Sequence, residues 1–130
     1  MKKIVVLGGG GFIGGHLAKR LKNEGNFVRI CDIKNHDYFS HDEICNEFVL
    51  ADLTDPVVVA QVIDENVDEV YQLAADMGGA GYIFTGDNDA NVMHNSAMIN
   101  LNVAKEAVNK KVKKVFYSSS ACMYPEYNQL

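Results

Sequence analysis

Apolar residues occur along this chain in two patterns. Five short runs are predominantly apolar, as expected of strands that are buried in a parallel sheet. The segments between them repeat apolar residues every three or four positions, which is the period of an amphipathic helix. The runs predicted as strands are 3–7, 27–31, 47–51, 69–73 and 115–117, and the segments predicted as helices are 12–24, 56–66 and 92–109. This alternation predicts an α/β fold with a parallel sheet and helices on both faces.

The faces and ends of the helices follow from their residues. The apolar positions of the segment 12–24 recur at helical spacing, and we expect them to face the sheet: Ile13, Leu17, Ala18 and Leu21. Gly25 is the predicted end of this helix, and Asp55 before Pro56 is a predicted N-cap followed by proline at the first helical position. Residues 34–46 are polar and show no recognised metal-ligand pattern, so we expect a solvated loop there.

A run of glycines lies between the first strand and the first helix. It contains two spacings, G-x-x-G-x-x-G at Gly8, Gly11 and Gly14 and G-x-G-x-x-G at Gly9, Gly11 and Gly14. Glycine accepts positive φ and lets the backbone approach a ligand closely. The helix N-terminus that follows carries unpaired N–H groups and partial positive charge, which suit a pyrophosphate. We therefore expect the peptide N–H groups of residues 8–14, including those of Phe12 and Ile13, to bind the phosphates of a dinucleotide.

Acidic residues follow the second and third strands. A carboxylate at Asp32 accepts hydrogen bonds from both ribose hydroxyls of an adenosine and repels a 2′-phosphate, which favours NAD over NADP. Lys34 argues mildly for NADP, and a turn residue is the alternative interpretation of Asp32. Asp52 is placed to accept from the adenine amino group while Leu53 covers the adenine face; alternatively, Asp52 or Thr54 caps the next helix. Together with the glycines, Asp32 predicts a Rossmann-like doubly wound sheet with strand order 3-2-1-4-5.

Small residues follow the fourth strand. Leu73, Ala74 and Ala75 would let a cofactor lie against the backbone, and the glycines of 78–81 would form a second ligand loop. Asn95, in the first turns of the segment 92–109, is predicted to lie near the nicotinamide.

Hydroxyls and a thiol follow the fifth strand, where open α/β sheets bind ligands. Ser120 and Cys122 are the candidates for chemistry there. A free cysteine is more often a small buried hydrophobe than a reactive group, so from residue type alone both interpretations of Cys122 remain open.

Composition excludes several classes of protein. The net charge of −5 over 130 residues gives no indication of nucleic-acid binding. No apolar run is long enough to span a bilayer, and no signal-peptide pattern precedes the first strand. Three widely spaced cysteines form neither a zinc pattern nor a disulfide framework, which favours a reducing cytoplasm.

Several motifs resemble the extended short-chain dehydrogenase/reductase superfamily, also described as NAD-dependent epimerases and dehydratases. They are G-x-x-G-x-x-G, the acidic end of the second strand, Asp52-Leu53, Leu73-Ala74-Ala75 and Ser118-Ser119-Ser120. Within this superfamily the segments 74–81 (AADMGGAG) and 119–126 (SSACMYPE) resemble the GDP-mannose 3,5-epimerase family. The GDP-fucose synthase family and the UDP-glucose 4-epimerases or dehydratases are the alternatives in the same superfamily.

The resemblance implies roles for particular residues. Ser120 would hydrogen-bond the 4-oxygen of the sugar, and Gly78 would touch a GDP-mannose-like nucleotide-sugar. Cys122 would be one of an acid/base pair at sugar C3 and C5, with a lysine as the other. Transient oxidation at C4 by NAD would acidify the neighbouring C–H bonds, and a thiol with a reference pKa near 8.5 is a plausible acid/base.

The chain departs from the superfamily pattern at one point. The superfamily uses a tyrosine four positions before a lysine, and none of the six tyrosines here is followed in that way. We therefore expect residues 1–130 to be the NAD-binding N-terminal part of a larger enzyme, weak in NAD binding and inactive alone. A non-catalytic dinucleotide sensor is a further alternative. Because strand 115–117 would form an exposed edge, we also expect a homodimer or other self-association.

Overall fold

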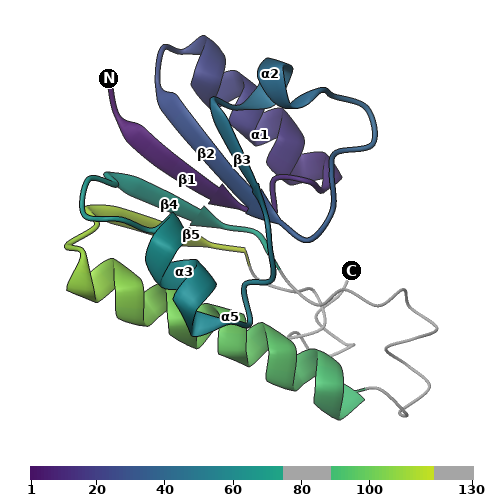
Figure 1. The fold of residues 1–130 in the computed structure, drawn as a ribbon, viewed down its shortest axis with the longest axis vertical. Helices are drawn as coiled ribbons and strands as arrows, with labels where there is room; N and C mark the ends of the chain where they lie inside the picture. The colour runs from purple at the N-terminus through teal and green to yellow at the C-terminus, as the bar shows by residue number, and fades with distance from the viewer. Residues whose placement is uncertain (75–88, 119–130) are drawn as a thin grey trace, which may run out of the picture.

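The computed structural model describes residues 1–74 and 89–118, with side chains for 1–74 and 94–118. Within these residues five parallel strands form one sheet with helices on both faces (Figure 1). The strands are β1 (Lys3–Leu7), β2 (Phe27–Asp32), β3 (Glu47–Leu50), β4 (Glu69–Gln72) and β5 (Lys114–Tyr117). The helices are α1 (Phe12–Asn23), α2 (His41–Ile44), α3 (Pro56–Val62) and α5 (Asp89–Asn109). The strand order β3-β2-β1-β4-β5 confirms the predicted doubly wound topology.

The strand register brings several carboxyl ends to one edge of the sheet. Leu7, the last residue of β1, pairs with Cys31 of β2 and with Gln72 at the end of β4. Asp32, the last residue of β2, pairs with Leu50 at the end of β3. The loops that leave these strands therefore begin side by side, and this is the edge at which such sheets bind ligands.

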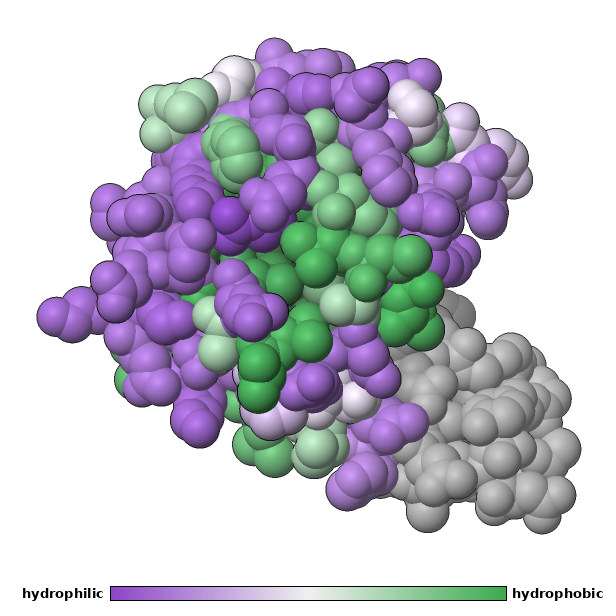
Figure 2. Space-filling view, viewed as in Figure 1, coloured by the Kyte–Doolittle hydropathy of each residue, from purple (hydrophilic) through white to green (hydrophobic). Residues whose placement is uncertain are grey.

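Each face of the sheet has its own core because alternate residues of a strand point to opposite faces. Val5 and Leu7 lie in a core covered by α3 and α5. Ile4 and Val6 lie in a core covered by α1 and α2. In the view of Figure 2, hydrophobic residues also gather near the middle of the molecular surface, bordered by hydrophilic ones.

The predicted sheet-facing side of α1 is partly wrong. Ile13 is 72% exposed, and Leu17 is only partly buried. The buried side of α1 consists of Gly14, Gly15, Ala18 and Leu21. Gly14 packs against the glycine loop and Gly15 against the His36 ring, and a Cβ at either position would overlap these neighbours.

The polar stretch 34–46 was predicted to be a solvated loop; most of it is exposed and non-helical, but the prediction is wrong for its second half. It contains α2, whose first turn holds Asp42 and Glu43, where carboxylates interact favourably with the helix dipole. Ile44 and Cys45 behind them are buried in the core under α1 and α2. Ile44 and Cys45, with the partly buried Phe39, anchor this segment on the core.

A capping residue defines the start of α3 as predicted, although α3 is shorter than expected. Asp55 accepts a hydrogen bond from the Val57 N–H at 2.9 Å, which confirms it as the N-cap of α3. The helix ends at Val62 rather than at residue 66, because the Asp64 side chain accepts from the Asn66 N–H at 3.0 Å and forms a local turn. The C-cap of α1 is Glu24 rather than the predicted Gly25, which follows it with φ of 93°.

An ionic network joins β1, β2 and β3 to the end of α3. Arg29 is 8% exposed, and its guanidinium donates to Glu47 at 3.0 Å, to Asp64 at 3.1 Å and to the Val62 carbonyl at 2.7 Å. Lys3 donates to the same Asp64 oxygen at 2.7 Å. Partial burial would raise the pKa of Asp64, but hydrogen bonds from Lys3, from the Asn66 N–H and from Arg29 outweigh it and lower this pKa to about 2.

Candidate functional site

The glycine loop turns directly against the end of β4. Gly8 has φ of 88° and donates its N–H to the Cys31 carbonyl at 2.8 Å. A Cβ on Gly8 would lie 2.7 Å from the Ala74 nitrogen, so both the conformation and the close approach exclude a side chain there. The loop is therefore held between β2 and β4.

The other two glycines of the G-x-x-G-x-x-G spacing differ in what the fold requires of them. A Cβ on Gly14 would lie 2.4 Å from the Gly8 carbonyl oxygen, so α1 can pack on the loop only without a side chain at this position. A Cβ on Gly11 would meet nothing closer than 3.4 Å, an ordinary contact, and the backbone there is extended. The fold therefore requires Gly14, whereas Gly11 leaves room on the outer side of the loop.

The first turn of α1 has no side-chain cap. Its N-cap is Gly11, so no side chain accepts from the first-turn N–H groups, and the first turn contains no acidic residue. The N–H groups of Phe12, Ile13 and Gly14 belong to the positions that lack intrahelical partners. Together with the helix dipole, they can bind a phosphate without a charged side chain.

Asp32 lies beside this turn and is partly buried. Its Oδ2 accepts from the Gly10 N–H at 2.8 Å, and its Oδ1 accepts from the Ile33 N–H at 2.6 Å. A carboxylate has about four acceptor positions, so Asp32 retains capacity for a ligand hydroxyl. The nearby Lys34 ammonium lies 3.7 Å from Asp37 in an exposed pair.

The loop after β3 contains two residues that were predicted to contact adenine, and only one of them is exposed. Asp52 is exposed, and its Oδ1 accepts from both the N–H and the hydroxyl of Thr54, at 2.9 and 2.8 Å. The Leu53 side chain is 3% exposed and packs in the core with Val5 and Val59. Asp52 is thus available to a ligand, whereas the Leu53 side chain already has partners.

Three amide side chains that the sequence analysis did not select hold these loops in place. Gln72, at the end of β4, is 3% exposed and hydrogen-bonds the Ala74 backbone and Asn100 of α5. Asn102 donates to the carbonyls of Leu53 and Thr54, each at 3.2 Å. The predicted nicotinamide residue Asn95 is partly buried on the same helix. For Gln72 the sequence did contain a signal: a polar glutamine occupies the last position of a buried strand.

His36 fixes the segment after β2 over α1. It is 8% exposed, and its Nδ1 accepts from the backbone N–H groups of Tyr38 and Phe39 at 3.0 and 3.1 Å. Its ring lies against Gly15, where a Cβ would come within 2.1 Å of an imidazole carbon. His36 is therefore a structural residue of this loop, and the sequence analysis had placed it in a solvated segment.

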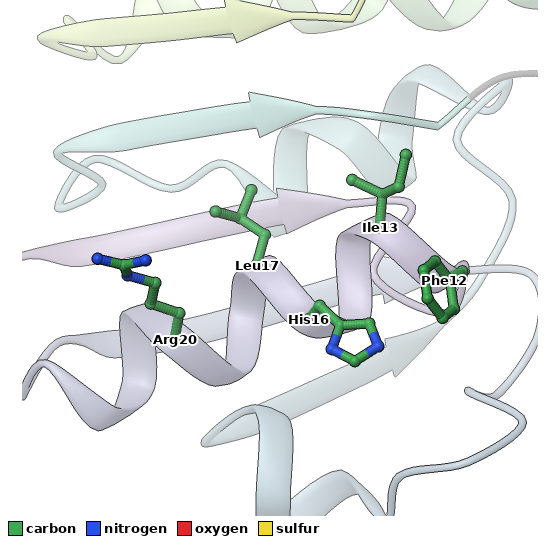
Figure 3. Close-up of a pocket in the computed structure, with 5 residues that line it drawn as sticks. All are labelled: Phe12, Ile13, His16, Leu17 and Arg20. Carbon is green, nitrogen blue, oxygen red and sulfur yellow. The ribbon is translucent and has the colours of Figure 1, made fainter.

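An exposed apolar area lies beside the N-terminus of α1. Phe12 is 67% exposed, and its ring contacts that of His16 edge-on at 4.6 Å between centroids. Figure 3 shows that Ile13, Leu17 and Arg20 point to one side of α1, whereas Phe12 and His16 lie next to each other. All five residues line a shallow pocket.

The two cysteines in the described part of the chain are structural. Cys31 and Cys45 are free and buried. Burial, reinforced by the Asp32 charge, raises the pKa of the Cys31 thiol to about 12, and burial raises that of Cys45 to about 11. Residues 1–74 and 89–118 contain no cluster of side chains that could hold a metal ion. Nor does any helix in these ranges have the length and apolar character needed to cross a membrane.

Four of the predicted site residues lie outside the described residues: Ala75, Gly78, Ser120 and Cys122. Within the described part, the structure brings together the glycine loop, Asp32 and Leu73–Ala74 at one edge of the sheet. This fold and this site define a dinucleotide-binding domain of the Rossmann type.

Comparison with known proteins identifies the family. The NAD dependent epimerase/dehydratase family matches residues 4–130, and the chain belongs to this family. The chain is 44% identical over 128 residues to the GDP-mannose 3,5-epimerase of Arabidopsis thaliana, covering 98% of this chain and 33% of that protein. It is 31% identical over 134 residues to the UDP-glucose 4-epimerase of Lactobacillus helveticus, covering 94% of this chain and 36% of that enzyme. The chain therefore spans about a third of the length of the curated relatives it matches.

Solved structures of epimerases have the same fold. The epimerase Mth375 of Methanothermobacter thermautotrophicus superimposes with a TM-score of 0.78 at 30% identity, over 96% of this chain and 37% of that chain. The UDP-glucose 4-epimerase of Stenotrophomonas maltophila, solved with bound NAD, superimposes with a TM-score of 0.80 at 23% identity, over 100% of this chain and 41% of that chain. The fold and the predicted resemblance to nucleotide-sugar epimerases are thereby confirmed.

Proposed function

We propose that the chain binds NAD at the carboxyl edge of its sheet and serves as the NAD-binding part of a nucleotide-sugar epimerase. The observation that carries this proposal is the uncapped first turn of α1, which faces outward beside Asp32. Backbone N–H groups of residues 8–14 would bind the pyrophosphate, and the Asp32 carboxylate would accept from the adenosine ribose. Membership of an NAD-dependent family supports this cofactor.

NAD rather than NADP is the cofactor that this site favours. The Asp32 carboxylate would face a 2′-phosphate, and the two negative charges would repel each other. Lys34 is the cation that could favour NADP, but its ammonium is already paired with Asp37. Titration of the chain with both dinucleotides by calorimetry tests this point, and equal affinity for the two would contradict it.

The proposed reaction is that of a GDP-mannose 3,5-epimerase, which 44% identity to the Arabidopsis enzyme supports. NAD, held by the N–H groups of residues 8–14 and by Asp32, would supply reversible hydride transfer at sugar C4. The C4 ketone acidifies the C3 and C5 hydrogens, and Cys122 would move a proton there while Ser120 binds the 4-oxygen and Gly78 contacts the nucleotide-sugar. These three residues are proposed from the sequence.

Hydrogen exchange with solvent tests this chemistry. In a protein that carries this chain together with a tyrosine–lysine pair and a nucleotide-sugar domain, deuterium should enter GDP-mannose at C3 and C5. Cys122→Ser should remove most of this exchange. The chain alone should show none, since no tyrosine in it precedes a lysine by four positions. Exchange at neither carbon in the longer protein would contradict the proposal.

A UDP-sugar 4-epimerase is the second candidate, because relatives with that name are 30–31% identical to this chain. It requires hydride transfer at C4 without proton exchange at C3 or C5. Conversion of UDP-glucose without deuterium incorporation would favour this candidate.

Self-association and a reducing compartment complete the proposal. β5 lies at one end of the sheet order, and Phe116 on it is 49% exposed. Exposed strand edges and apolar residues favour pairing with another chain. Sedimentation at increasing concentration tests this point, and a monomer throughout would contradict it.

The free thiols of Cys31 and Cys45 fit a cytoplasmic location.

A further inference from the structure

We propose that Gln72 is a positioning residue for the dinucleotide crevice and that Asn100 of α5 orients it. This inference rests on the proposed NAD site, but its structural part can be tested without the cofactor. Gln72 is the last residue of β4 and is 3% exposed. Neither Gln72 nor Asn100 belongs to the glycine motif or to the residues that were predicted to contact a ligand.

The Gln72 side chain continues the pairing of β4 beyond the end of the strand. Its Oε1 accepts from the Ala74 N–H at 3.1 Å, and its Nε2 donates to the Ala74 carbonyl at 2.8 Å. The side-chain amide therefore satisfies both polar backbone groups of Ala74, as a neighbouring strand would. Since an N–H must face the oxygen and a carbonyl must face the nitrogen, only one orientation of the amide works.

Asn100 supports that orientation from the helix. Its Oδ1 accepts the second hydrogen of Gln72 Nε2 at 2.9 Å. Both donors of the Gln72 amide are then used, and Nε2 has no remaining hydrogen for another partner. The pair links α5 to the end of β4 through one buried amide.

The Ala74 backbone is also the surface on which the glycine loop rests. The nearest atoms to a Cβ on Gly8 would be the Ala74 nitrogen at 2.7 Å and the Leu73 carbonyl carbon at 2.8 Å. The Leu73 N–H donates to the Leu7 carbonyl at 2.8 Å, immediately before the loop begins. A shift of Ala74 therefore reaches Gly8, and with it the N–H groups proposed to bind the pyrophosphate.

Isosteric and conservative variants test this link. Gln72→Glu keeps the shape but removes the donor to the Ala74 carbonyl and to Asn100. We expect it to raise the Kd for NAD at least tenfold, because both hydrogen bonds donated by Nε2 are lost. Gln61→Glu is the matched control, because Gln61 is an exposed residue of α3, and it should leave the Kd unchanged.

Substitutions at Asn100 separate positioning from folding, because Asn100 is an exposed residue of the helix. Asn100→Asp keeps an oxygen that accepts from Gln72 Nε2 and should retain wild-type affinity. Asn100→Leu removes the acceptor and should raise the Kd several-fold, with the thermal midpoint within a few degrees of wild type. Wild-type affinity in both Gln72→Glu and Asn100→Leu would overturn the proposal, as would equal losses in Asn100→Asp and Asn100→Leu.

An NMR measurement without cofactor distinguishes failure of this inference from failure of the proposed function. In ¹⁵N-labelled Asn100→Leu, the amide signals of Ala74 and Gly8 should both shift, whereas in Asn100→Asp the Gly8 signal should stay near its wild-type position. A Gly8 signal that does not respond to Asn100→Leu would overturn the coupling, whether or not NAD binds.

Discussion

The backbone N–H of Gly10 donates to Oδ2 of Asp32 over 2.8 Å, and this bond joins the glycine loop to the end of β2. The residue proposed to bind the adenosine ribose therefore also shapes the loop proposed to bind the phosphates. A Cβ on Gly10 would lie 2.8 Å from the same oxygen, so the approach depends on glycine. Two parts of the proposed site are thus connected by a single carboxylate.

Replacement of that carboxylate should weaken NAD binding and reduce the discrimination against NADP. In Asp32→Asn one side-chain oxygen becomes an NH₂ group, which cannot accept from Gly10 or from Ile33. We expect the Kd for NAD to rise at least tenfold, about the effect of one charged hydrogen bond. The ratio of NADP to NAD affinity should increase, because the repelling charge is gone. Calorimetric titration of both dinucleotides measures this ratio.

Glu65→Gln is the control for charge alone, since Glu65 is an exposed residue that follows α3. It should leave the preference for NAD intact. An unchanged preference in Asp32→Asn would contradict the role of Asp32.

Two glycine-to-alanine substitutions should separate ligand binding from folding. In Gly14→Ala the new methyl group would lie 2.4 Å from the Gly8 oxygen, so this variant should lose stability, by about 1–3 kcal/mol for a forced overlap. In Gly11→Ala the nearest atom is 3.4 Å away, so stability should stay near wild type. NAD affinity should nevertheless fall, because the methyl group points to where the pyrophosphate approaches.

Urea denaturation measures the stability of the two variants, and titration with NAD measures their affinity. Wild-type NAD binding in a stable Gly11→Ala variant would place the phosphates elsewhere.

The network around Asp64 should make stability depend on pH in the acid range. The folded pKa of about 2 lies below the ordinary aspartate pKa of 3.8, so the ionised carboxylate stabilises the fold above pH 4. That contribution is lost as pH falls through the folded pKa. Since the Asp64 side chain is 35% exposed, solvent screening reduces the contribution to about 1 kcal/mol.

Urea denaturation of wild type and Asp64→Asn tests this prediction. The difference between them should be largest near pH 7 and should fall by roughly half near pH 3, as linkage requires. A difference that is independent of pH between 7 and 3 would show that the charge of Asp64 is irrelevant.

The buried thiols should react slowly in the folded chain. Burial raises the pKa of Cys31 to about 12 and that of Cys45 to about 11, so neither forms a thiolate near neutral pH. Alkylation followed by peptide mass spectrometry should show little modification of either residue in the native chain and full modification in urea. Rapid native labelling of Cys31 would contradict the burial of β2.

Particular residues show why much of the sheet was predictable. Strands such as Lys3–Leu7 are continuous apolar runs, and their positions depend only on local sequence. The N-cap Asp55 and the glycine spacing at Gly8, Gly11 and Gly14 were also predictable, because each depends on residue types at fixed positions in the local sequence. Asp32 was selected as a candidate because a carboxylate at the end of the second strand has a recognised place in this fold.

Other features depend on contacts between distant segments. Ile13 has helical spacing, but the buried residues of the first turn are Gly14, against the glycine loop, and Gly15, against the His36 ring, and Ile13 is exposed. His36 becomes buried only because Gly15, far from it in the chain, leaves space for its ring. Gln72 and Asn100 are separated by 28 positions, and no periodicity in the sequence pairs them.

Titration of the ¹⁵N-labelled chain with NAD, followed by amide NMR, tests the central proposal most directly. Saturable shifts concentrated on the amides of residues 8–14 and on Ile33 beside Asp32 are the predicted result. Amide signals of residues 8–14 that stay unchanged at saturating NAD, or shifts confined to the opposite edge of the sheet, would contradict the proposed site.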